Sequence, residues 1–559
     1  MKEELSLVIK NCLCNLGYDV SSVHISKSDL CDFQCNDVFK IAKEFHKSPI
    51  EIGEALVDEI NSLSDFSSYF DSVSFAKPGF INIMVSDSLI SKYLVLLNDN
   101  FDSLFLSDNP LTFVLDYGGP NVAKPLHVGH MRTAIVGESI KRIIEFCGHK
   151  TISDVHLGDF GLQIGEVIYG VLRDGLSIDD IDIKYLDKIY PEMNAICKED
   201  ESIKDECARI TKELQDGNLE YRKLWKKILE VSRADIKHNY DFLDVSFDYW
   251  YGESDAYKYL DKTESILRNK GILEESLGAL VVDVSEQDDK KEIPPLLFKK
   301  SNGAYLYAST DLSTIVQRVE DFNPDHILYV VDNRQELHFT QVFRTCDKAG
   351  IIDKSKLEFL GYGTVNGSDN KPYKTRNGNS PKLESLFDDA RSIFISKKDS
   401  NKDMSIFDVN KIVNAILKFA DLSNSRSKDY IFDLNKFSDV TGKTGPYILY
   451  TYLRIKKILD MYGDGVISSS SNSFDRDLRL KLLEINDSID LAFNERMPHY
   501  IADYVYNLCV CANIFYQNNH VSSMEDCKVR DSWIYVLSLT NYVIKRMLYL
   551  LVIDIPSIM

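Results

Sequence analysis

The segment from Leu111 to Gly165 constrains the fold most, because strand-like and helix-like patterns alternate over a short distance. Residues 112–117 are apolar, partly β-branched and followed by Gly118, Gly119 and Pro120, which predicts a buried strand that ends in a loop. Apolar residues then recur at helical spacing up to Gly148, namely Val136, Ile140, Ile143, Ile144 and Cys147. Because residues 150–155 again resemble a strand, the segment predicts a βαβ unit and a parallel sheet.

The sequence His127-Val128-Gly129-His130 lies between the first strand and the helix of this unit. Unpaired backbone NH groups and the positive end of the helix dipole make this position an anion site. Gly129 would let a ligand approach the backbone, and two imidazoles one turn apart could donate hydrogen bonds to a phosphate. The pattern therefore predicts a nucleotide site, although an isolated HxGH more often marks surface or core histidines at a helix start.

Composition bounds the class of protein. With 559 residues, 44% hydrophobic and 27% charged, the chain is expected to be globular, with two to four domains. No apolar run is long enough for a membrane span, and the start, with Glu3 and Glu4, does not resemble a secretion signal, so a cytoplasmic protein is expected. The 11 cysteines form no CxxC pair, which favours free thiols over a metal site.

The net charge of −21 is unusual for an RNA-binding protein. Phosphate contact depends on the local field, however, which is screened beyond a Debye length of about 8 to 10 Å. The 65 lysines and arginines are enough for basic tracks on an acidic surface. The charge therefore does not exclude nucleic acid as a partner.

Three regions follow from the patterns. Residues 1–108 mix helices and short strands and predict a small α+β domain. Residues 109–403 alternate strands and helices and predict a doubly wound parallel-sheet, Rossmann-like α/β domain, interrupted near 174–254 by a helical insertion with mostly solvated charges. Residues 404–559 are nearly all helical.

Seven further segments occur together and in order. They are AKPGFINIMVS, PNVAKPLHVGH, HLGDFGLQIG, SNGAYLYASTDLS, YVVDNRQELHFTQVF, KFADLSNSRSKDYIFD and TGPYILYTYLRI. Over nearly the whole chain this series resembles class I aminoacyl-tRNA synthetases, specifically arginyl-tRNA synthetases. The resemblance implies an N-terminal tRNA-contacting domain, a helical anticodon-binding domain and a monomer. It also implies an arginine-tRNA ligase, which activates L-arginine with ATP to arginyl-adenylate and transfers arginine to the 3′ end of tRNA(Arg), with the tRNA needed for the first step.

The resemblance assigns catalytic and ATP-binding roles to His127, His130 and Gly129, whose segment matches the class signature His-Ile-Gly-His. A second catalytic element is the glycine-containing loop 361–378, at the place of the Lys-Met-Ser-Lys-Ser loop of the class. Here Lys374-Thr375-Arg376-Asn377-Gly378 lacks the second lysine, as arginyl enzymes commonly do, so Lys374 is the loop cation and Lys124 the candidate substitute. We expect Mg²⁺ to arrive on ATP, with no protein-bound metal.

A guanidinium has five NH donors and a permanent charge, so a pocket for arginine requires carboxylates. The family motif places Asp116, Asn121, Tyr307, Asp311 and Gln335 around the amino acid. Tyr307 and Asp311 would take the guanidinium, and the other three would bind its remaining donors or the α-groups. On local grounds alone, Asp311 could equally be a helix N-cap and Tyr307 a strand core residue.

In the helical region Tyr447, Tyr450 and Arg454 fall on one helix face, and the resemblance assigns them to anticodon-loop binding. A tyrosine stripe at this spacing is more often core. Two rival functions stay open: another HxGH nucleotidyltransferase or class I synthetase, and a non-catalytic tRNA-binding paralogue. Asn121 with Asp311 argues against the first, and the intact His127, His130 and Lys374 argue against the second.

Overall fold

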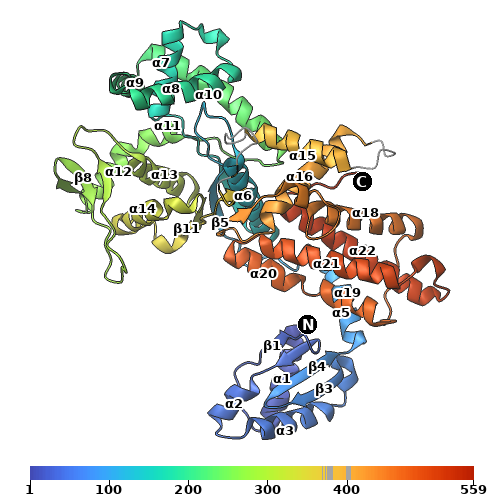
Figure 1. Ribbon diagram of the computed structural model, residues 1–559. Coiled ribbons are helices and arrows are strands. Elements are labelled where there is room, and N and C mark those ends of the chain that lie inside the picture. Colours follow the sequence, from blue (N-terminus) through green and yellow to red (C-terminus); the bar gives the residue numbers. More distant parts are fainter. Residues whose placement is uncertain (368, 372, 374–381, 398–403) are drawn as a thin grey trace. The chain divides into compact units, whose positions relative to one another are not determined.

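The computed structural model describes residues 1–367, 369–371, 373, 382–397 and 404–559 (Figure 1). The chain divides into two units. Unit 1 comprises Met1–Phe105, Tyr450–Ser488 and Tyr504–Arg546, and unit 2 comprises Leu106–Leu449, Ile489–Asp503 and Met547–Met559. The sequence-based domain boundaries at 108/109 and 403/404 stay predictions.

Unit 2 contains a four-stranded sheet in the order β11-β10-β5-β6, in which every neighbouring pair is parallel. The strands are β5 (Thr112–Tyr117), β6 (Lys150–Asp154), β10 (His326–Val330) and β11 (Leu357–Phe359). From β5 the chain adds β6 on one side and later β10 and β11 on the other. The strand order therefore reverses between β5 and β10, and ligands of such sheets bind outside the carboxyl ends at this reversal.

The βαβ unit expected between Leu111 and Val155 is confirmed: α6 (Val128–Phe146) joins β5 to β6, and Gly148 follows it with a φ of +81°. The helix is not amphipathic in the usual sense, because its polar face is buried as well. Arg142 pairs with Glu138 at 2.9 Å, and Arg132 donates to the carbonyl oxygen of Gly363 at 2.6 Å. This helix is thus enclosed on all sides, which fixes the direction of its N-terminus.

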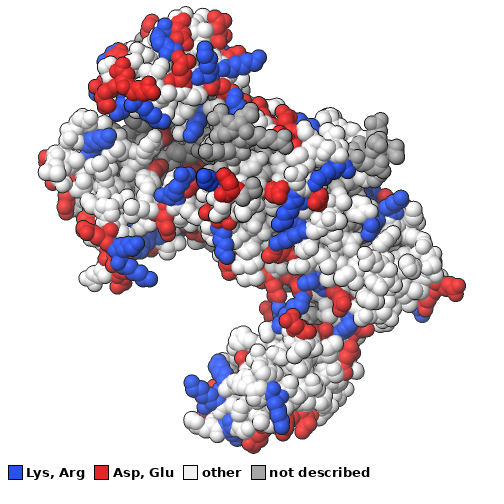
Figure 2. Space-filling view, in the orientation of Figure 1, with Lys and Arg blue, Asp and Glu red and all other residues white. Residues whose placement is uncertain are grey.

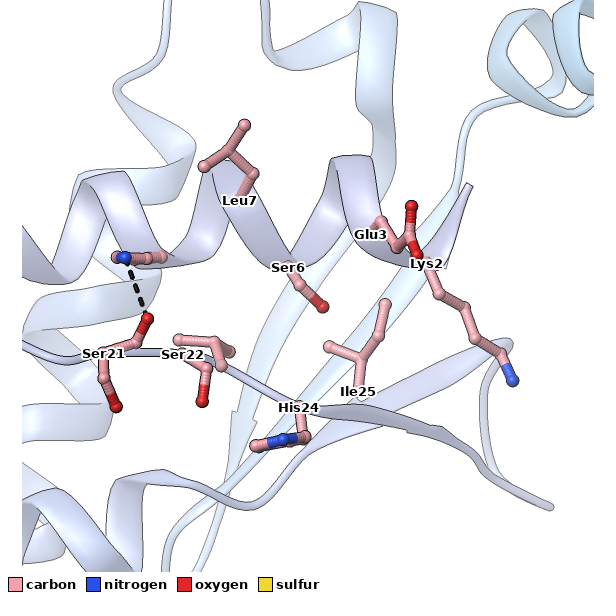
Figure 3. A pocket seen from close by; sticks show the side chains of 10 residues that line it. Lys2, Glu3, Ser6, Leu7, Ser21, Ser22, His24 and Ile25 are labelled. Carbon is pink, nitrogen blue, oxygen red and sulfur yellow. Dashed lines mark hydrogen bonds between the residues drawn. The ribbon is translucent and has the colours of Figure 1, made fainter. Parts of the chain in front are cut away.

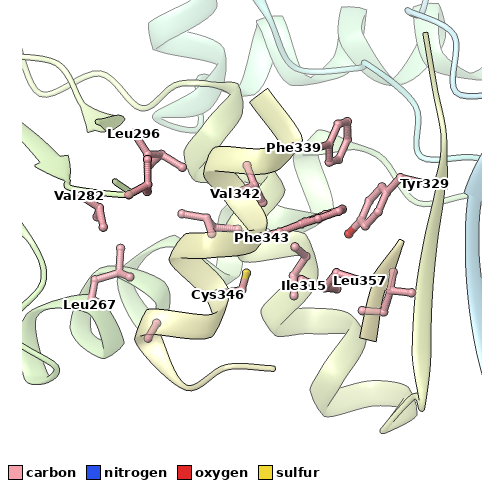
Figure 4. Close-up of a cluster of buried hydrophobic side chains, with 14 of the residues drawn as sticks. Leu267, Val282, Leu296, Ile315, Tyr329, Phe339, Val342, Phe343, Cys346 and Leu357 are labelled. Atoms are coloured by element: carbon pink, nitrogen blue, oxygen red, sulfur yellow. The ribbon is translucent and has the colours of Figure 1, made fainter. Parts of the chain in front are cut away.

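A buried apolar cluster packs the sheet against α12 (Leu260–Asn269), α13 (Tyr307–Phe322) and α14 (Glu336–Ala349) (Figure 4). Its centre is aromatic: the ring of Tyr329 on β10 lies 4.7 Å from that of Phe339 and 5.6 Å from that of Phe343. Leu312 and Ile315 bring α13 into the same cluster. The cluster therefore holds α13 firmly against the ends of β5 and β10.

The helical insertion is present between β6 and α13 and lies together in Figure 1 as α7 to α10. Its helices are α7 (Leu162–Asp174), α8 (Ile183–Glu199), α9 (Glu201–Gln215) and α10 (Leu219–Phe242), followed by the short α11 (Glu253–Ala256). Side chains of both charges crowd its surface (Figure 2). A three-stranded antiparallel sheet, which the sequence did not predict, follows as β7 (Glu274–Ser276), β8 (Ala279–Val282) and β9 (Leu296–Lys299).

The region after residue 404 is helical apart from the short strand β13 (Tyr430–Ile431), which pairs with β12 (Val365–Asn366). The helix α15 (Leu383–Lys397) precedes this region. The α-helices of the region are α16 (Ile406–Leu422), α17 (Leu434–Phe437), α18 (Gly445–Tyr462), α19 (Ser473–Leu482), α20 (Ile485–Glu495), α21 (His499–Asn518) and α22 (Cys527–Leu550). Four of them contribute residues to both units: α18, α20, α21 and α22.

The last residues of the chain are bound to the helices of unit 2. Ser139 of α6 donates to the carbonyl oxygen of Leu550 at 2.6 Å. Lys418 of α16 is buried and donates to the carbonyl oxygen of Val552, also at 2.6 Å. Burial lowers the pKa of Lys418 to about 7, because the charged ammonium loses its hydration.

Lys418 should make stability depend on pH. Because its pKa is about 7 in the folded chain and near 10.5 when unfolded, the unfolded state binds more protons between these values. The free energy of unfolding therefore gains a contribution that rises with pH from about 7 to 10.5. We expect Lys418→Met to lose this rise, as denaturant titrations of both proteins at pH 7 and 9.5 would reveal. A difference between the two that is the same at both pH values would contradict this.

Unit 1 begins with a four-stranded antiparallel sheet in the order β1-β2-β4-β3. Its strands are β1 (Ile25–Lys27), β2 (Phe33–Cys35), β3 (Phe70–Ala76) and β4 (Phe80–Val85), with α1 (Lys2–Asn15), α2 (Val38–Glu44), α3 (Pro49–Asn61), α4 (Phe66–Tyr69) and α5 (Asp87–Asn100). This is the α+β arrangement expected for the N-terminal region. Nowhere in the described parts of the chain is a helix long and apolar enough to cross a membrane.

Candidate active site

The two signature histidines form the first turn of α6. Nδ1 of His127 accepts the backbone NH of Gly129, and Nδ1 of His130 accepts the backbone NH of His127, both at 3.1 Å. The rings are 3.9 Å apart between centroids. Together these bonds form a capping box, which satisfies donors at the helix N-terminus and fixes both rings.

Both imidazoles are neutral at physiological pH. Burial, with Lys124 and Arg334 as nearby positive charges, lowers the pKa of His127 to about 4. Burial lowers the pKa of His130 well below its usual range, and His127 and Lys124 add to the effect. Since Nδ1 is an acceptor in each ring, the proton lies on Nε2. The pair thus presents two fixed Nε2–H donors, which can stabilise charge on a phosphate without proton transfer.

The absence of a Cβ at Gly129 leaves room for the imidazole ring of His127. A Cβ at this position would lie 2.9 Å from Cε1 of His127, so a side chain would displace the imidazole ring. Glycine at this position therefore lets the His127 ring approach the backbone closely. Whether a ligand also uses this space stays a prediction.

Described residues at the start of the loop 361–378 and beyond it are bound to α6 and to the segment that precedes it. Arg132 of α6 donates to the carbonyl oxygen of Gly363 at the start of the loop. Beyond its end, the NH of Leu383 donates to the carbonyl oxygen of Leu126 at 2.9 Å, and Lys382 forms a β-bridge with His127. Lys374, the predicted loop cation, lies outside the described residues. Lys124 is half-buried, and its positive charge adds to the effect of burial in lowering the pKa values of both histidines.

Three of the predicted arginine-binding residues, Asp116, Asn121 and Gln335, lie at or after the carboxyl ends of the parallel strands β5 and β10, and Tyr307 and Asp311 lie on α13. Asp116 is at the end of β5, and Asn121 forms a β-bridge with Gly158 in the loop after β6. Gln335 is exposed and directly precedes α14. Tyr307 is the first residue of α13, with 59% of its surface exposed, so the alternative of a strand core residue is wrong.

Asp311 lies one turn after Tyr307 on α13 and is not the N-cap, which is Leu306. Its Oδ2 is 2.5 Å from Nε2 of His338 on α14. Asp116 accepts a hydrogen bond from Arg318 at 2.7 Å. Both predicted carboxylates are therefore held by cationic or donor side chains of the protein. Neither His338 nor Arg318 was predicted from the sequence.

A third carboxylate, that of Glu253, interacts electrostatically with Asp311. Glu253, the first residue of α11, is partly buried, and burial raises its pKa to about 7. His156 opposes this rise, whereas Asp159 and Asp311 add to it. The sequence placed Glu253 at the end of the insertion, whose charges were expected to be mostly solvated. Its local sequence gave no sign of burial.

The segment 156–160 contacts two loops of the proposed pocket, the one that carries Asn121 and the one that carries Glu253. Leu157 forms a β-bridge with Gly252, and Asp159 accepts hydrogen bonds from the backbone and side chain of Ser254 at 2.9 and 2.7 Å. A Cβ on Gly158 would lie 2.2 Å from Oδ1 of Asn121. The loops that carry Asn121 and Glu253 are therefore packed on this segment from two sides.

The predicted tRNA-binding residues lie on α18. Tyr450 is 40% exposed, whereas Tyr447 and Arg454 are half-buried. Arg454 donates to the hydroxyl of Tyr450 at 2.9 Å and lies 4.7 and 4.8 Å from the rings of Tyr450 and Tyr516. Tyr450 is thus not simply a core residue. Its role in RNA binding stays a prediction.

A separate cleft of about 400 Å³ lies in unit 1, between α1 and the segment 21–25 (Figure 3). Lys2 and Lys10 contribute positive charge to its lining, and Lys10 donates to the carbonyl oxygen of Ser21 at 2.9 Å. The lining also includes Ser6, Ser21, Ser22 and His24.

A parallel nucleotide fold whose strand order reverses beside a pair of neutral histidines at a helix start is the arrangement expected of HxGH nucleotidyltransferases, which include the class I aminoacyl-tRNA synthetases. Comparison with known families agrees: residues 94–434 match the class I (R) tRNA synthetase catalytic domain, 1–85 the arginyl tRNA synthetase N terminal domain and 448–559 the DALR anticodon binding domain. The chain belongs to the arginyl-tRNA synthetase family.

Relatives match this chain from end to end. A protein named arginine–tRNA ligase from Alkaliphilus oremlandii is 40% identical and covers 99% of each chain, and one from Agathobacter rectalis is 39% identical and covers 100% of each. The arginyl-tRNA synthetase structure from Thermus thermophilus aligns over 100% of each chain with a TM-score of 0.81 at 20% identity. The fold predicted from sequence is therefore confirmed.

Proposed function

We propose how this arginine–tRNA ligase divides its reaction among the residues described above. ATP is a substrate of class I synthetases. In the first step the arginine carboxylate attacks the α-phosphate of ATP in line, giving arginyl-adenylate and pyrophosphate. The Nε2–H groups of His127 and His130 stabilise the charge that develops on the phosphate, and Lys124 and Lys374 bind the pyrophosphate. The ribose hydroxyl at the 3′ end of tRNA(Arg) then accepts the arginyl group.

One observation carries this assignment. The fixed histidine donors begin α6, the next helix after β5, and Asp116 is the next-to-last residue of that strand. An amino acid bound at Asp116 would therefore present its carboxylate beside a phosphate bound at His127 and His130. Asp311 and Glu253 would bind the guanidinium at the far end of the side chain, with Tyr307, Asn121 and Gln335 as further contacts. Carboxylates match the planar fork of a guanidinium in charge and geometry.

The remaining partners follow from the same chemistry. Mg²⁺ would enter bound to the triphosphate of ATP; among the described residues no group of three or more His, Cys, Asp or Glu side chains could hold a metal ion. Tyr447, Tyr450 and Arg454 would contact unpaired bases and phosphates of the anticodon loop. We further propose a cytoplasmic monomer, in line with the family resemblance.

Glu253 should make arginine binding depend on pH. With a pKa of about 7 in the free protein, its carboxyl group is largely protonated at pH 6 and ionised at pH 8. Because a guanidinium binds the ionised form more strongly, the KM for arginine should fall severalfold as the pH rises from 6 to 8. Glu253→Gln should have a higher KM that depends less on pH. An unchanged pH profile in this variant would exclude Glu253 from the pocket.

The function is tested by charging a total tRNA pool with each labelled amino acid in turn, with and without ATP. We expect ATP-dependent incorporation of arginine alone. Incorporation of another amino acid would overturn the pocket assignment at Asp116, Tyr307 and Asp311, and tRNA binding without any incorporation would favour the non-catalytic paralogue.

The need for tRNA is a separate prediction. Pyrophosphate exchange with ATP and arginine should be absent without tRNA(Arg) and appear when it is added, because the family resemblance implies that bound tRNA completes the site. The exchange is measured with labelled pyrophosphate under both conditions. Full exchange without tRNA would refute the prediction.

A further inference from the structure

A single buried arginine joins two carboxylates beneath the proposed arginine pocket. Nη2 of Arg318 donates to Oδ2 of Asp116 at 2.7 Å and to Oδ2 of Asp154 at 2.9 Å. The side chain of Arg318 is 1% exposed, and that of Asp154 is 2% exposed. The hydrogen bond to Arg318 uses Oδ2 of Asp116 and leaves Oδ1 for a ligand.

The three residues that Arg318 contacts form one row across the sheet. Tyr329 on β10, Asp116 on β5 and Asp154 on β6 are neighbours in register. The guanidinium carbon of Arg318 lies 5.4 Å from the centre of the Tyr329 ring. From α13, Arg318 therefore contacts β10, β5 and β6, where the strand order of the sheet reverses.

Arg318 also belongs to the helix that carries Tyr307 and Asp311. Positions 307, 311 and 318 are four and seven residues apart, so they share one face of α13. Movement of this helix would shift Arg318 and Asp311 together. The two carboxylates proposed to bind arginine, Asp116 and Asp311, are thus linked through one rigid element.

Asp154 is the fixed partner in this arrangement. Its Oδ1 accepts the backbone NH groups of His156 and Tyr251 at 3.2 and 3.1 Å. Although burial opposes it, His156 and Arg318 lower the pKa of Asp154 to about 2, so this carboxylate is ionised. Burial raises the pKa of Asp116, and Arg318 and His156 counteract that rise. Without Arg318, two neighbouring buried carboxylates would repel each other.

We propose that Arg318 is a positioning residue, which holds the Asp116 carboxylate against Asp154 so that Asp116 can bind L-arginine. This inference rests on the proposed role of Asp116 in the arginine pocket. Arg318 does not touch the substrate in this arrangement. It fixes the orientation of Asp116 and stabilises the negative charge of this buried carboxylate.

The test compares Arg318→Gln, Arg318→Lys, Asp116→Asn and the double variant Arg318→Gln/Asp116→Asn in steady-state tRNA charging. Removing one partner of a buried charged pair should raise the KM for arginine about 30-fold or more in Arg318→Gln. The KM for ATP should stay within about twofold. Arg318→Lys should recover part of the loss, because an ammonium can still donate to a carboxylate. The double variant should be no worse than Asp116→Asn, since Arg318 acts through Asp116.

Arg142→Gln is the matched control, because Arg142 is a buried arginine of the same unit that pairs with Glu138 and Asp244. It should lower the thermal midpoint without raising the KM for arginine. If Arg318→Gln does not fold, the inference is tested with Arg318→Lys, whose affinity for arginine is measured directly by calorimetry. A KM for arginine unchanged in the folded Arg318 variants, or additive effects in the double variant, would overturn the inference. An unchanged KM in Asp116→Asn would instead overturn the role of Asp116.

Discussion

Replacing His130 by alanine is expected to slow adenylate formation about 100- to 1,000-fold, the usual cost of losing one preorganised donor to a transition state. The geometry makes the loss specific: Nδ1 of His130 is occupied by the backbone NH of His127, so only Nε2–H can reach a phosphate. The rate is measured in single-turnover reactions with tRNA bound. The KM for arginine should change little, because His130 is not part of the arginine pocket.

His238 on α10 provides the control for this experiment, since its side chain is exposed and lies outside the site. His238→Ala should react at the rate of the unaltered protein. Because burial lowers the pKa of His127 to about 4 and lowers the pKa of His130 well below its usual range, both rings stay neutral between pH 6 and 8. A fall in rate of less than tenfold in His130→Ala would show that the histidine pair does not stabilise the transition state.

Asp311→Asn is expected to raise the KM for arginine about 30-fold or more, because the proposed charge-assisted pair with the guanidinium is lost. The substitution keeps the size of the side chain and one acceptor oxygen, so the effect reports on charge. His338 already lies 2.5 Å from Asp311, and its contact shows that the carboxylate can accept a strong donor. Steady-state charging at varied arginine gives the value.

Asp321→Asn serves as the comparison, because Asp321 is an exposed residue of the same helix α13. Its KM for arginine should equal that of the unaltered protein. If Asp311→Asn lowers only kcat and leaves the KM for arginine unchanged, the guanidinium is bound elsewhere and the pocket must be reassigned.

Local patterns predicted the elements that surround the nucleotide site. The strand, the histidine-containing helix start and the second strand occur where apolar periodicity and glycine placed them, because each is determined by its neighbours in the chain. The polar face of α6 misled this reasoning, since Arg132, Glu138 and Arg142 are charged yet buried. Their burial depends on distant residues such as Asp421 and Asp244, which no local pattern contains.

Motif order assigned Asp116 and Asp311 to the proposed pocket, whereas Arg318, His338, Glu253 and His156 were not predicted. Arg318 and His338 contact carboxylates more than 25 positions away in the chain, Asp116 and Asp311. A charged residue in a helix interior looks solvated until the tertiary structure is known. Sequence reasoning therefore identified groups proposed to touch the substrate better than groups that hold them.

The shared charges of this pocket limit how its specificity can be redesigned. Among the described residues, five carboxylates occur with three neighbouring cationic or donor side chains: Asp116, Asp154, Asp159, Glu253 and Asp311 with Arg318, His156 and His338. The guanidinium of a bound arginine would offset part of the surplus negative charge. A neutral amino acid of the same shape would leave surplus negative charge in a buried place. Acceptance of such a substrate should therefore require several carboxylates to be neutralised at once, and single substitutions are a poor route to it.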